Sequence, residues 1–213
     1  MQAADQTSPA RDDVAGTRKD ILEVATREFA DKGLSGARVD EIAELTRSSK
    51  RMIYYHFGSK EELYRAVLER AYARIRRHEE RVDIENLPAD EALARICEVT
   101  FDYHQQHPEF VRLVMNENML RGQTVRRVEV ARAENRMIIA RLEELLARGA
   151  ADGLFRAGLD PVDLHATISA LCFHPVSNRY TFSANFQRDM ESAEAVVARR
   201  AIVAETVLRW CRA

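Results

Sequence analysis

Apolar residues recur every three or four positions along most of this chain, which is the spacing of one face of an α-helix. The first such run is Ile21, Leu22, Ala25 and Phe29, and the glycine at position 33 suits the end of that helix. No segment alternates clearly between apolar and polar residues, as a strand would. The first helix is expected to begin at Thr17. The same pattern predicts further helices over residues 39–46, 49–57, 59–81, 89–106, 108–120, 124–151, 161–176 and 192–211.

Composition supports an all-helical protein, and the length of the chain allows one large domain or two small ones. The 213 residues include only eight glycines and five prolines, and 46% of residues are hydrophobic against 31% charged. The long helix that starts near Ser59 is long enough to reach from one domain into another. No apolar run approaches the roughly 20 residues that span a bilayer, so we expect no membrane partner. Residues 1–16 are polar, lack the apolar core of a secretion signal and are expected to form a disordered arm.

Metal and redox chemistry find little support in the sequence. The three cysteines, Cys97, Cys172 and Cys211, are widely spaced and form no CxxC pair. The histidine pairs have no carboxylate or thiolate at metal-ligand spacing, so we expect no metal and no cofactor. Nucleophile-elbow, phosphate-loop and zinc signatures are also missing, which argues against an enzyme.

One short stretch concentrates positive charge although the formal net charge of the chain is only -2. Residues 47–60 read RSSKRMIYYHFGSK and contain four cations, paired tyrosines and no acid. Two short helices, 39–46 and 49–57, flank a tight break and follow a bracing helix, the arrangement of a helix-turn-helix. The second of them fits the major groove of DNA. A solvated helix face is the alternative interpretation of the stretch.

Position along this second helix assigns different roles to its residues. Lys50 and Arg51 lie in its first turn, where side chains reach base edges. Ile53 and Phe57 are spaced i, i+4 and are expected to face the core. Hydroxyl and imidazole groups that suit phosphate oxygens come from Tyr54, Tyr55 and His56, and an ammonium group comes from Lys60 in the first turn of the next helix.

Residues 17–70 resemble the N-terminal domain of the tetracycline-repressor-like (TetR) family of bacterial regulators. The resemblance is carried by ILEVATREFADKG, VDEIAE and MIYYHFGSKEELYRAVL, and it covers about a quarter of the chain. It implies an all-α fold, with a helix-turn-helix DNA-binding domain over residues 17–62 (the motif itself at about 39–57). Residues 63–213 would form a larger helical domain for effector binding and dimerisation. The segment DYHQQHPEFVRLVMNENML is similar to a subgroup whose members often regulate catabolism of small compounds.

Carried onto this sequence, the resemblance implies contacts with a double-stranded DNA operator from Arg38, Ser49, Lys50, Arg51, Met52, Tyr54, Tyr55, His56 and Lys60. Three positions depart from the family pattern. Arg47 stands where many members have glycine, which costs roughly 1 kcal/mol if its φ is positive. Ala37 replaces a common threonine, with Arg38 beside it as a substitute charge. Asp40 occupies a position where some relatives carry a base-reading cation, and a carboxylate there would repel phosphate.

The resemblance further implies a homodimer and a small-molecule effector. Two helices near the C-terminus would form the dimer face through Ala166, Ser169, Ala170, Phe173, Ile202, Val203, Thr206 and Trp210, with burial inside the monomer as the alternative. Polar residues on apolar helix faces suggest an effector site. The expected effector-binding residues are Phe101, His104, Met115, Asn118, Asn135 and Cys172.

The sequence therefore predicts a DNA-binding transcriptional regulator, a dimeric repressor of a pseudo-palindromic operator that a small molecule releases. The resemblance also implies a bacterial cytoplasmic location. Two alternatives stay open at this point: a TetR-type activator, and a small-molecule carrier without DNA activity.

Overall fold

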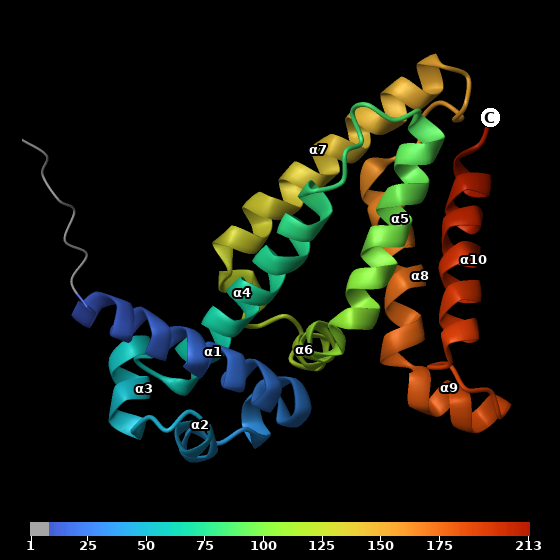
Figure 1. The fold of residues 1–213 in the computed structure, drawn as a ribbon. Helices are drawn as coiled ribbons and strands as arrows, with labels where there is room; N and C mark the ends of the chain where they lie inside the picture. Colours follow the sequence, from blue (N-terminus) through green and yellow to red (C-terminus); the bar gives the residue numbers. More distant parts are fainter. Residues whose placement is uncertain (1–8) are drawn as a thin grey trace, which may run out of the picture. The chain divides into compact units, whose positions relative to one another are not determined.

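The computed structural model describes residues 9–213, except for the side chains of residues 9–15 and 130–134. This described part is all-helical, as predicted, and contains no strand (Figure 1). Its helices are α1 Pro9–Gly36, α2 Val39–Leu45, α3 Lys50–Phe57, α4 Lys60–Glu80, α5 Ala89–Gln106, α6 Pro108–Met119, the 3-10 turn η1 Val125–Arg127, α7 Glu129–Ala151, α8 Pro161–Ser177, α9 Arg179–Phe186 and α10 Ala193–Cys211.

The observed helices differ from the predicted ones at two helix starts and by one additional helix. Helix α1 begins at Pro9, a residue well suited to a first helical position, so residues 9–16 are helical rather than a disordered arm. The rest of that prediction, residues 1–8, lies outside the described residues. Helix α7 begins at Glu129 because η1 replaces its first turn, and the buried Glu117 carboxylate accepts the backbone N–H groups of Thr124 and Val125 (3.1 and 2.9 Å). Helix α9 was not predicted.

The described chain divides into two compact units, the first of which comprises residues 9–70 and 112–127. Helix α1 breaks at Gly33, whose φ of 67° is outside the helical range, so the predicted helix end is confirmed. The Phe29 and Tyr64 rings meet edge to face, with centroids 5.0 Å apart. The core of this unit is built from α1–α4 and includes Ile21, Leu22, Ala25, Phe29, Ile42, Ile53, Leu63, Tyr64, Val67 and Leu68.

The expected boundary between residues 62 and 63 differs from the observed division. Helix α4 belongs to the first unit as far as Arg70, and residues 112–127 return to that unit from much later in the chain. Two contacts hold this returning segment: Arg112 pairs with Asp31 at 3.2 Å, and the Asn116 amide donates to the carbonyl oxygen of Phe29 at 3.0 Å. Tertiary contacts of this kind cannot be read from local periodicity.

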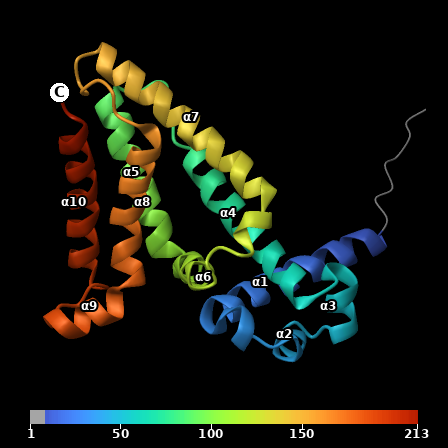
Figure 2. The ribbon, with the colours of Figure 1, turned by 180° about the vertical axis from the view of Figure 1, so that it is seen from behind.

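The second unit contains residues 71–111 and 128–213. Within it, α5, α8 and α10 run side by side in both views (Figures 1 and 2). Helix α8 starts at Pro161, capped by the Asp160 carboxylate, which accepts the N–H groups of Val162 and Asp163. The apolar core of the unit includes Leu93, Ile96, Cys97, Phe101, Leu142, Leu145, Leu164, Ile168, Cys172, Val203, Val207 and Cys211.

Candidate DNA interface, dimer face and effector site

The turn between α2 and α3 closes through backbone hydrogen bonds. The N–H of Ser48 donates to the Ala43 carbonyl (3.0 Å) and that of Arg47 to the Glu44 carbonyl (3.2 Å), which is the Schellman pattern of a helix end. Arg47 takes the left-handed position at φ 52°, where many relatives have glycine. The Ser49 hydroxyl then caps α3 by accepting the N–H of Met52 (3.2 Å). The predicted helix-turn-helix is therefore present.

Helix α3 separates its buried and exposed residues as the spacing predicted. Ile53 and Phe57 are buried, and the Arg18 guanidinium lies over the Phe57 ring, 5.0 Å from its centroid. The side chains expected to touch DNA from this helix are exposed, with one exception. The exposed set is Lys50, Arg51, Met52, Tyr54 and Tyr55, with Ser49 ahead of it and Arg38 at the start of α2 also exposed.

Three of the residues expected to contact DNA are paired with, or partly enclosed by, other groups of the protein. Lys50 forms an ion pair with Asp40 at 2.9 Å. The Lys60 ammonium, partly buried, donates to the Ser35 carbonyl at 3.4 Å. The exception in α3 is His56: its ring is partly buried, and its Nε2 atom is enclosed without a hydrogen-bond partner among the described residues. The Nε2 atom of His56 is thus less accessible than the exposed side chains of α3, and its phosphate contact stays a prediction.

The residues expected at the dimer face all lie in the second unit and differ in how exposed their side chains are. Ala166, Ala170, Ile202 and Thr206 are exposed, while Ser169 and Phe173 are partly buried. Val203 is 1% exposed and belongs to the core, so its place in the predicted dimer face is wrong. One residue along a helix turns the side chain by about 100°, and Val203 lines up with Val207 instead of Ile202.

Trp210 is also partly buried, although it was expected on the dimer face. It packs against the core and its ring lies 5.1 Å from the Arg156 guanidinium. Two exposed valines that were not predicted, Val162 on α8 and Val197 on α10, extend the apolar surface of these helices.

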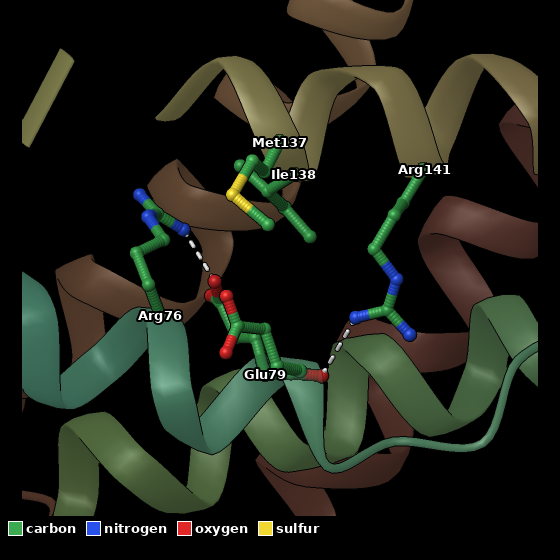
Figure 3. A pocket seen from close by; sticks show the side chains of 6 residues that line it. Arg76, Glu79, Met137, Ile138 and Arg141 are labelled. Atoms are coloured by element: carbon green, nitrogen blue, oxygen red, sulfur yellow. Dashed lines mark hydrogen bonds and ion pairs between the residues drawn. The ribbon is translucent and has the colours of Figure 1, made fainter. Parts of the chain in front are cut away.

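A buried polar cluster lies inside the second unit, and it includes two of the residues expected to bind an effector. Arg76 and Glu79 of α4 form an ion pair with less than a tenth of either side chain exposed. The Arg76 Nε group donates to the amide oxygen of Asn135 on α7 (2.9 Å), and the Thr100 hydroxyl of α5 donates to Glu79 (3.4 Å). Figure 3 shows the pair facing Met137 and Ile138, with Arg141 bonded to the Glu79 carbonyl oxygen. These residues, with Glu80, line a cavity of about 10 Å³, room for roughly one water molecule.

Two histidines share this environment. The Nδ1 atom of His104 lies 2.7 Å from the Thr100 carbonyl oxygen, which can only accept, so Nδ1 carries the proton and Nε2 is left as an acceptor. Burial lowers the pKa of His104. Burial, and then the positive charge of Arg76 and the proximity of His104, lower the pKa of His165 to about 4. Burial raises the pKa of Glu79, against the opposing effect of Arg76. Both imidazoles are therefore neutral near pH 7.

The remaining expected effector residues are two from the first unit and two from the apolar core of the second. Met115 and Asn118 belong to the first unit and are exposed, and the Asn118 amide donates to its own helix at the Val114 carbonyl (2.9 Å). Because His104 belongs to the second unit, their convergence with it stays a prediction. Phe101 and Cys172 are fully buried in the apolar core, and the Cys172 thiol faces the Cys97 carbonyl at 3.7 Å.

Sequence reasoning missed Arg76, Glu79, Thr100 and His165. The apolar stripe of α4 gave one usable signal: continuing it by four positions from Ile75 leads to Glu79, a carboxylate where an apolar residue is expected. A wider hollow of about 250 Å³ lies between α7 and residues 156–161, but none of its lining residues is a buried polar one.

The part of the chain that the structure describes contains no group of three or more His, Cys, Asp or Glu side chains that could hold a metal ion. Over the same residues, no helix is long and apolar enough to cross a membrane.

The helix-turn-helix and its exposed basic helix define a DNA-binding transcriptional regulator. Two family models match: residues 21–67 match "Bacterial regulatory proteins, tetR family", and residues 90–207, more than half of the chain, match "Tetracyclin repressor-like, C-terminal domain". The chain therefore belongs to the tetR family of bacterial regulatory proteins, and the prediction that it is not an enzyme is confirmed.

Several relatives are named regulators. The HTH-type transcriptional repressor NicS of Pseudomonas putida is 33% identical over 92% of each chain. The HTH-type transcriptional repressor SCO4008 of Streptomyces coelicolor is 37% identical over 53% of this chain and 55% of its own length. Among solved structures, the transcriptional regulator SCO4942 of Streptomyces coelicolor is 29% identical, with a TM-score of 0.69 over 92% of this chain and 98% of that one.

Proposed function

We propose that this protein is a cytoplasmic, dimeric repressor that binds a pseudo-palindromic DNA operator and is released by a small-molecule effector. The DNA-binding part of the proposal rests on helix α3. This helix buries Ile53 and Phe57 on one side and exposes basic and aromatic residues on the other. Such a face offers cations and hydroxyl donors to the major groove and its phosphates. A carrier protein without DNA activity would have no use for it.

Repression is favoured over activation by how much of the chain the named relatives cover. NicS, named a repressor, aligns over 92% of both chains. FasR of Mycolicibacterium smegmatis, named an activator, is 33% identical over only 54% of this chain. An activator is therefore the second candidate.

The effector would bind at the polar cluster of Arg76, Glu79, Asn135 and His104. Arg76, Glu79 and Asn135 pair with one another beside a cavity with room for roughly one water molecule, so an effector would replace some of these contacts and widen the cavity. The neutral His104 leaves Nε2 as an acceptor, and Arg76 supplies donors, so the cluster suits a small polar or aromatic compound with both kinds of group. Helix α4 carries Arg76 near its end and the proposed DNA contact Lys60 at its start, so a tilt of α4 would link the two events.

The dimer would form through the exposed parts of α8 and α10. A single helix-turn-helix makes few contacts, whereas a two-fold dimer presents two recognition helices about 34 Å apart, the length of one helical turn of DNA. Ala166 and Ala170 allow close helix approach, and Ile202 and Val197 supply exposed apolar surface.

The first test is selection of bound sequences from a random duplex pool, followed by binding measurements on the selected and on random DNA. We expect a pseudo-palindrome with half-sites about one helical turn apart. Arg51→Ala should weaken the selected site most, by about 1–3 kcal/mol, and relax one base position. Lys60→Ala should weaken all sequences about equally.

Arg74→Ala, a change of equal charge at an exposed residue of the second unit, is the matched control and should leave DNA binding unchanged. Equal losses from Arg51→Ala on selected and random DNA would remove Arg51 from base reading. If no sequence is selected, the operator-binding proposal fails.

A further inference from the structure

An acidic residue lies against the first cation of the recognition helix. Asp40, in the first turn of α2, places its carboxylate oxygens 2.9 and 3.2 Å from the Lys50 ammonium at the start of α3. The two side chains are 48% and 49% exposed, so the pair lies on the surface of the first unit. The hydrogen bond and charge of Asp40 raise the pKa of Lys50, which remains fully charged at neutral pH. A carboxylate on a surface that binds a polyanion calls for an explanation.

The other charges nearby do not share this arrangement. The neighbouring carboxylate, Glu41, pairs with Lys32 at 2.6 Å instead. Arg51, next to Lys50, forms no ion pair with any described residue. Arg38 is a further cation near Lys50, and its charge opposes the effect of Asp40 on the pKa of that lysine. Among the described residues, Asp40 forms its ion pair with Lys50 and not with Arg51.

The two kinds of DNA contact open to Lys50 respond differently to this carboxylate. A phosphate contact carries no sequence information, and it would bring a second anion close to Asp40. A base contact does not have this cost, because the guanine O6 and N7 atoms are neutral acceptors. The ammonium has three N–H groups, so it can keep one on Asp40 and give the others to the base. Asp40 also removes side-chain freedom from a long, mobile lysine and fixes where its ammonium lies.

We propose that Asp40 is a specificity-determining residue, which positions Lys50 for a guanine in the major groove and keeps it from the phosphate backbone. The proposal rests on the base contact of Lys50 that belongs to the proposed function. Asp40 then lowers the affinity for random DNA more than the affinity for the operator. The ratio of operator affinity to random-DNA affinity, which decides whether a repressor finds its site in a genome, therefore rises.

The test compares Asp40→Asn with Glu41→Gln, Lys50→Met and the Asp40→Asn/Lys50→Met double variant in the full-length protein. Asp40→Asn and Glu41→Gln remove the same charge from the same turn of α2, but only the first frees Lys50. Each protein is taken through selection from a random duplex pool. Its affinity for a duplex of the sequence selected by the unchanged protein, and for a random duplex, is then measured across a salt series. Asp40→Ser, which also suits a helix N-terminus, serves as a second variant should Asp40→Asn fold poorly.

For Asp40→Asn we expect tighter binding to random DNA than Glu41→Gln produces. We expect a salt dependence steeper by about 0.9 in slope for each lysine that gains a phosphate. The preference for guanine at one position of each half-site should fall by roughly fivefold or more. Lys50→Met should abolish that preference, and adding Asp40→Asn to it should change nothing further.

Three results would overturn the proposal, and they are distinguishable. If Asp40→Asn matches Glu41→Gln in salt slope and guanine preference, Asp40 is an ordinary surface ion pair. If Lys50→Met keeps the guanine preference, the operator-binding function stands but Lys50 does not read the base. If the unchanged protein selects no sequence at all, the proposed function itself fails.

Discussion

The side-chain amide of Asn116 donates a hydrogen bond of 3.0 Å to the carbonyl oxygen of Phe29, 87 positions earlier in the chain. A second hydrogen bond, of 3.3 Å, reaches the Ala30 carbonyl. Both acceptors lie near the end of the regular part of α1, before the break at Gly33, where carbonyl groups lose their helical partners. Asn116 therefore satisfies the end of a helix that braces the helix-turn-helix.

Asn116→Ala should consequently destabilise the protein. We expect the free energy of unfolding to fall by about 1–2 kcal/mol, since two partly buried carbonyl groups lose a donor. Asn116→Asp should cost more because a carboxylate would face carbonyl oxygens. Urea unfolding followed by circular dichroism measures both. The control is Asn118→Ala on the same helix, whose amide is exposed and bonds only within α6; an equal loss there would argue against a special role for Asn116.

Substitution of Arg47 with glycine, by contrast, should stabilise the protein. Its φ of 52° is the left-handed conformation, which costs a residue with a side chain about 1–2 kcal/mol and glycine almost nothing. Glycine adds about 0.5–1 kcal/mol of backbone entropy to the unfolded chain, so the net gain from Arg47→Gly should be about 0.5–1 kcal/mol. Thermal unfolding provides the measurement. Arg47→Ala keeps the strained φ and should give no gain, and a loss on Arg47→Gly would show that the arginine side chain itself stabilises the turn.

How far these features follow from the sequence depends on the range of the interactions involved. The burial of Ile53 and Phe57 and the cap at Ser49 are local, so spacing within α3 predicted them correctly. Val203 shows the limit of spacing: the neighbouring Ile202 is 47% exposed, and a single step around α10 separates a surface from a core position.

The buried polar cluster was harder to predict because its chemistry is assembled from several helices. Charged residues on a helix are usually solvated, so Arg76 and Glu79 looked like surface residues in the sequence. Their burial depends on Thr100 of α5 and Asn135 of α7, which bond to them across the second unit. Asn135 and His104 stood out in the sequence because each interrupts an apolar stripe, and their effector-binding role stays a prediction. Nothing local in the sequence reveals that Met115 and Asn118 lie in a segment, residues 112–127, that returns to the first unit.

The buried histidines make stability depend on pH. His165 has a folded-state pKa of about 4, below its ordinary value of 6.5, so the folded protein binds its proton less readily than the unfolded chain does. Its contribution is therefore fully present above pH 6.5 and is lost as pH falls toward 4, by an amount of up to about 3 kcal/mol. His104, whose pKa is lowered by burial, acts in the same direction.

Urea unfolding at several pH values between 7 and 4 tests this dependence. His165→Gln should flatten the fall in stability over that range, and the slope is the readout because the substitution also changes packing. His174→Gln, at an exposed histidine of the same helix, should leave the slope unchanged. An unaltered slope for His165→Gln would show that other groups cause the acid sensitivity.

The exposed apolar side chains of α10 allow a direct test of the dimer. Ile202 is 47% and Val197 is 68% exposed, so both offer apolar surface to a partner helix in the proposed dimer. Ile202→Glu would place a charge in the proposed interface and should give a monomer in sedimentation or light-scattering measurements. Its affinity for the selected operator should fall by tenfold or more, roughly 1.4 kcal/mol, because each monomer then binds one half-site alone. Met119→Glu, at a residue of the first unit that is 84% exposed, is the matched control and should remain dimeric. If Ile202→Glu also stays dimeric and binds normally, α10 does not form the interface, and the exposed face of α8 with Ala166 and Ala170 becomes the next surface to substitute.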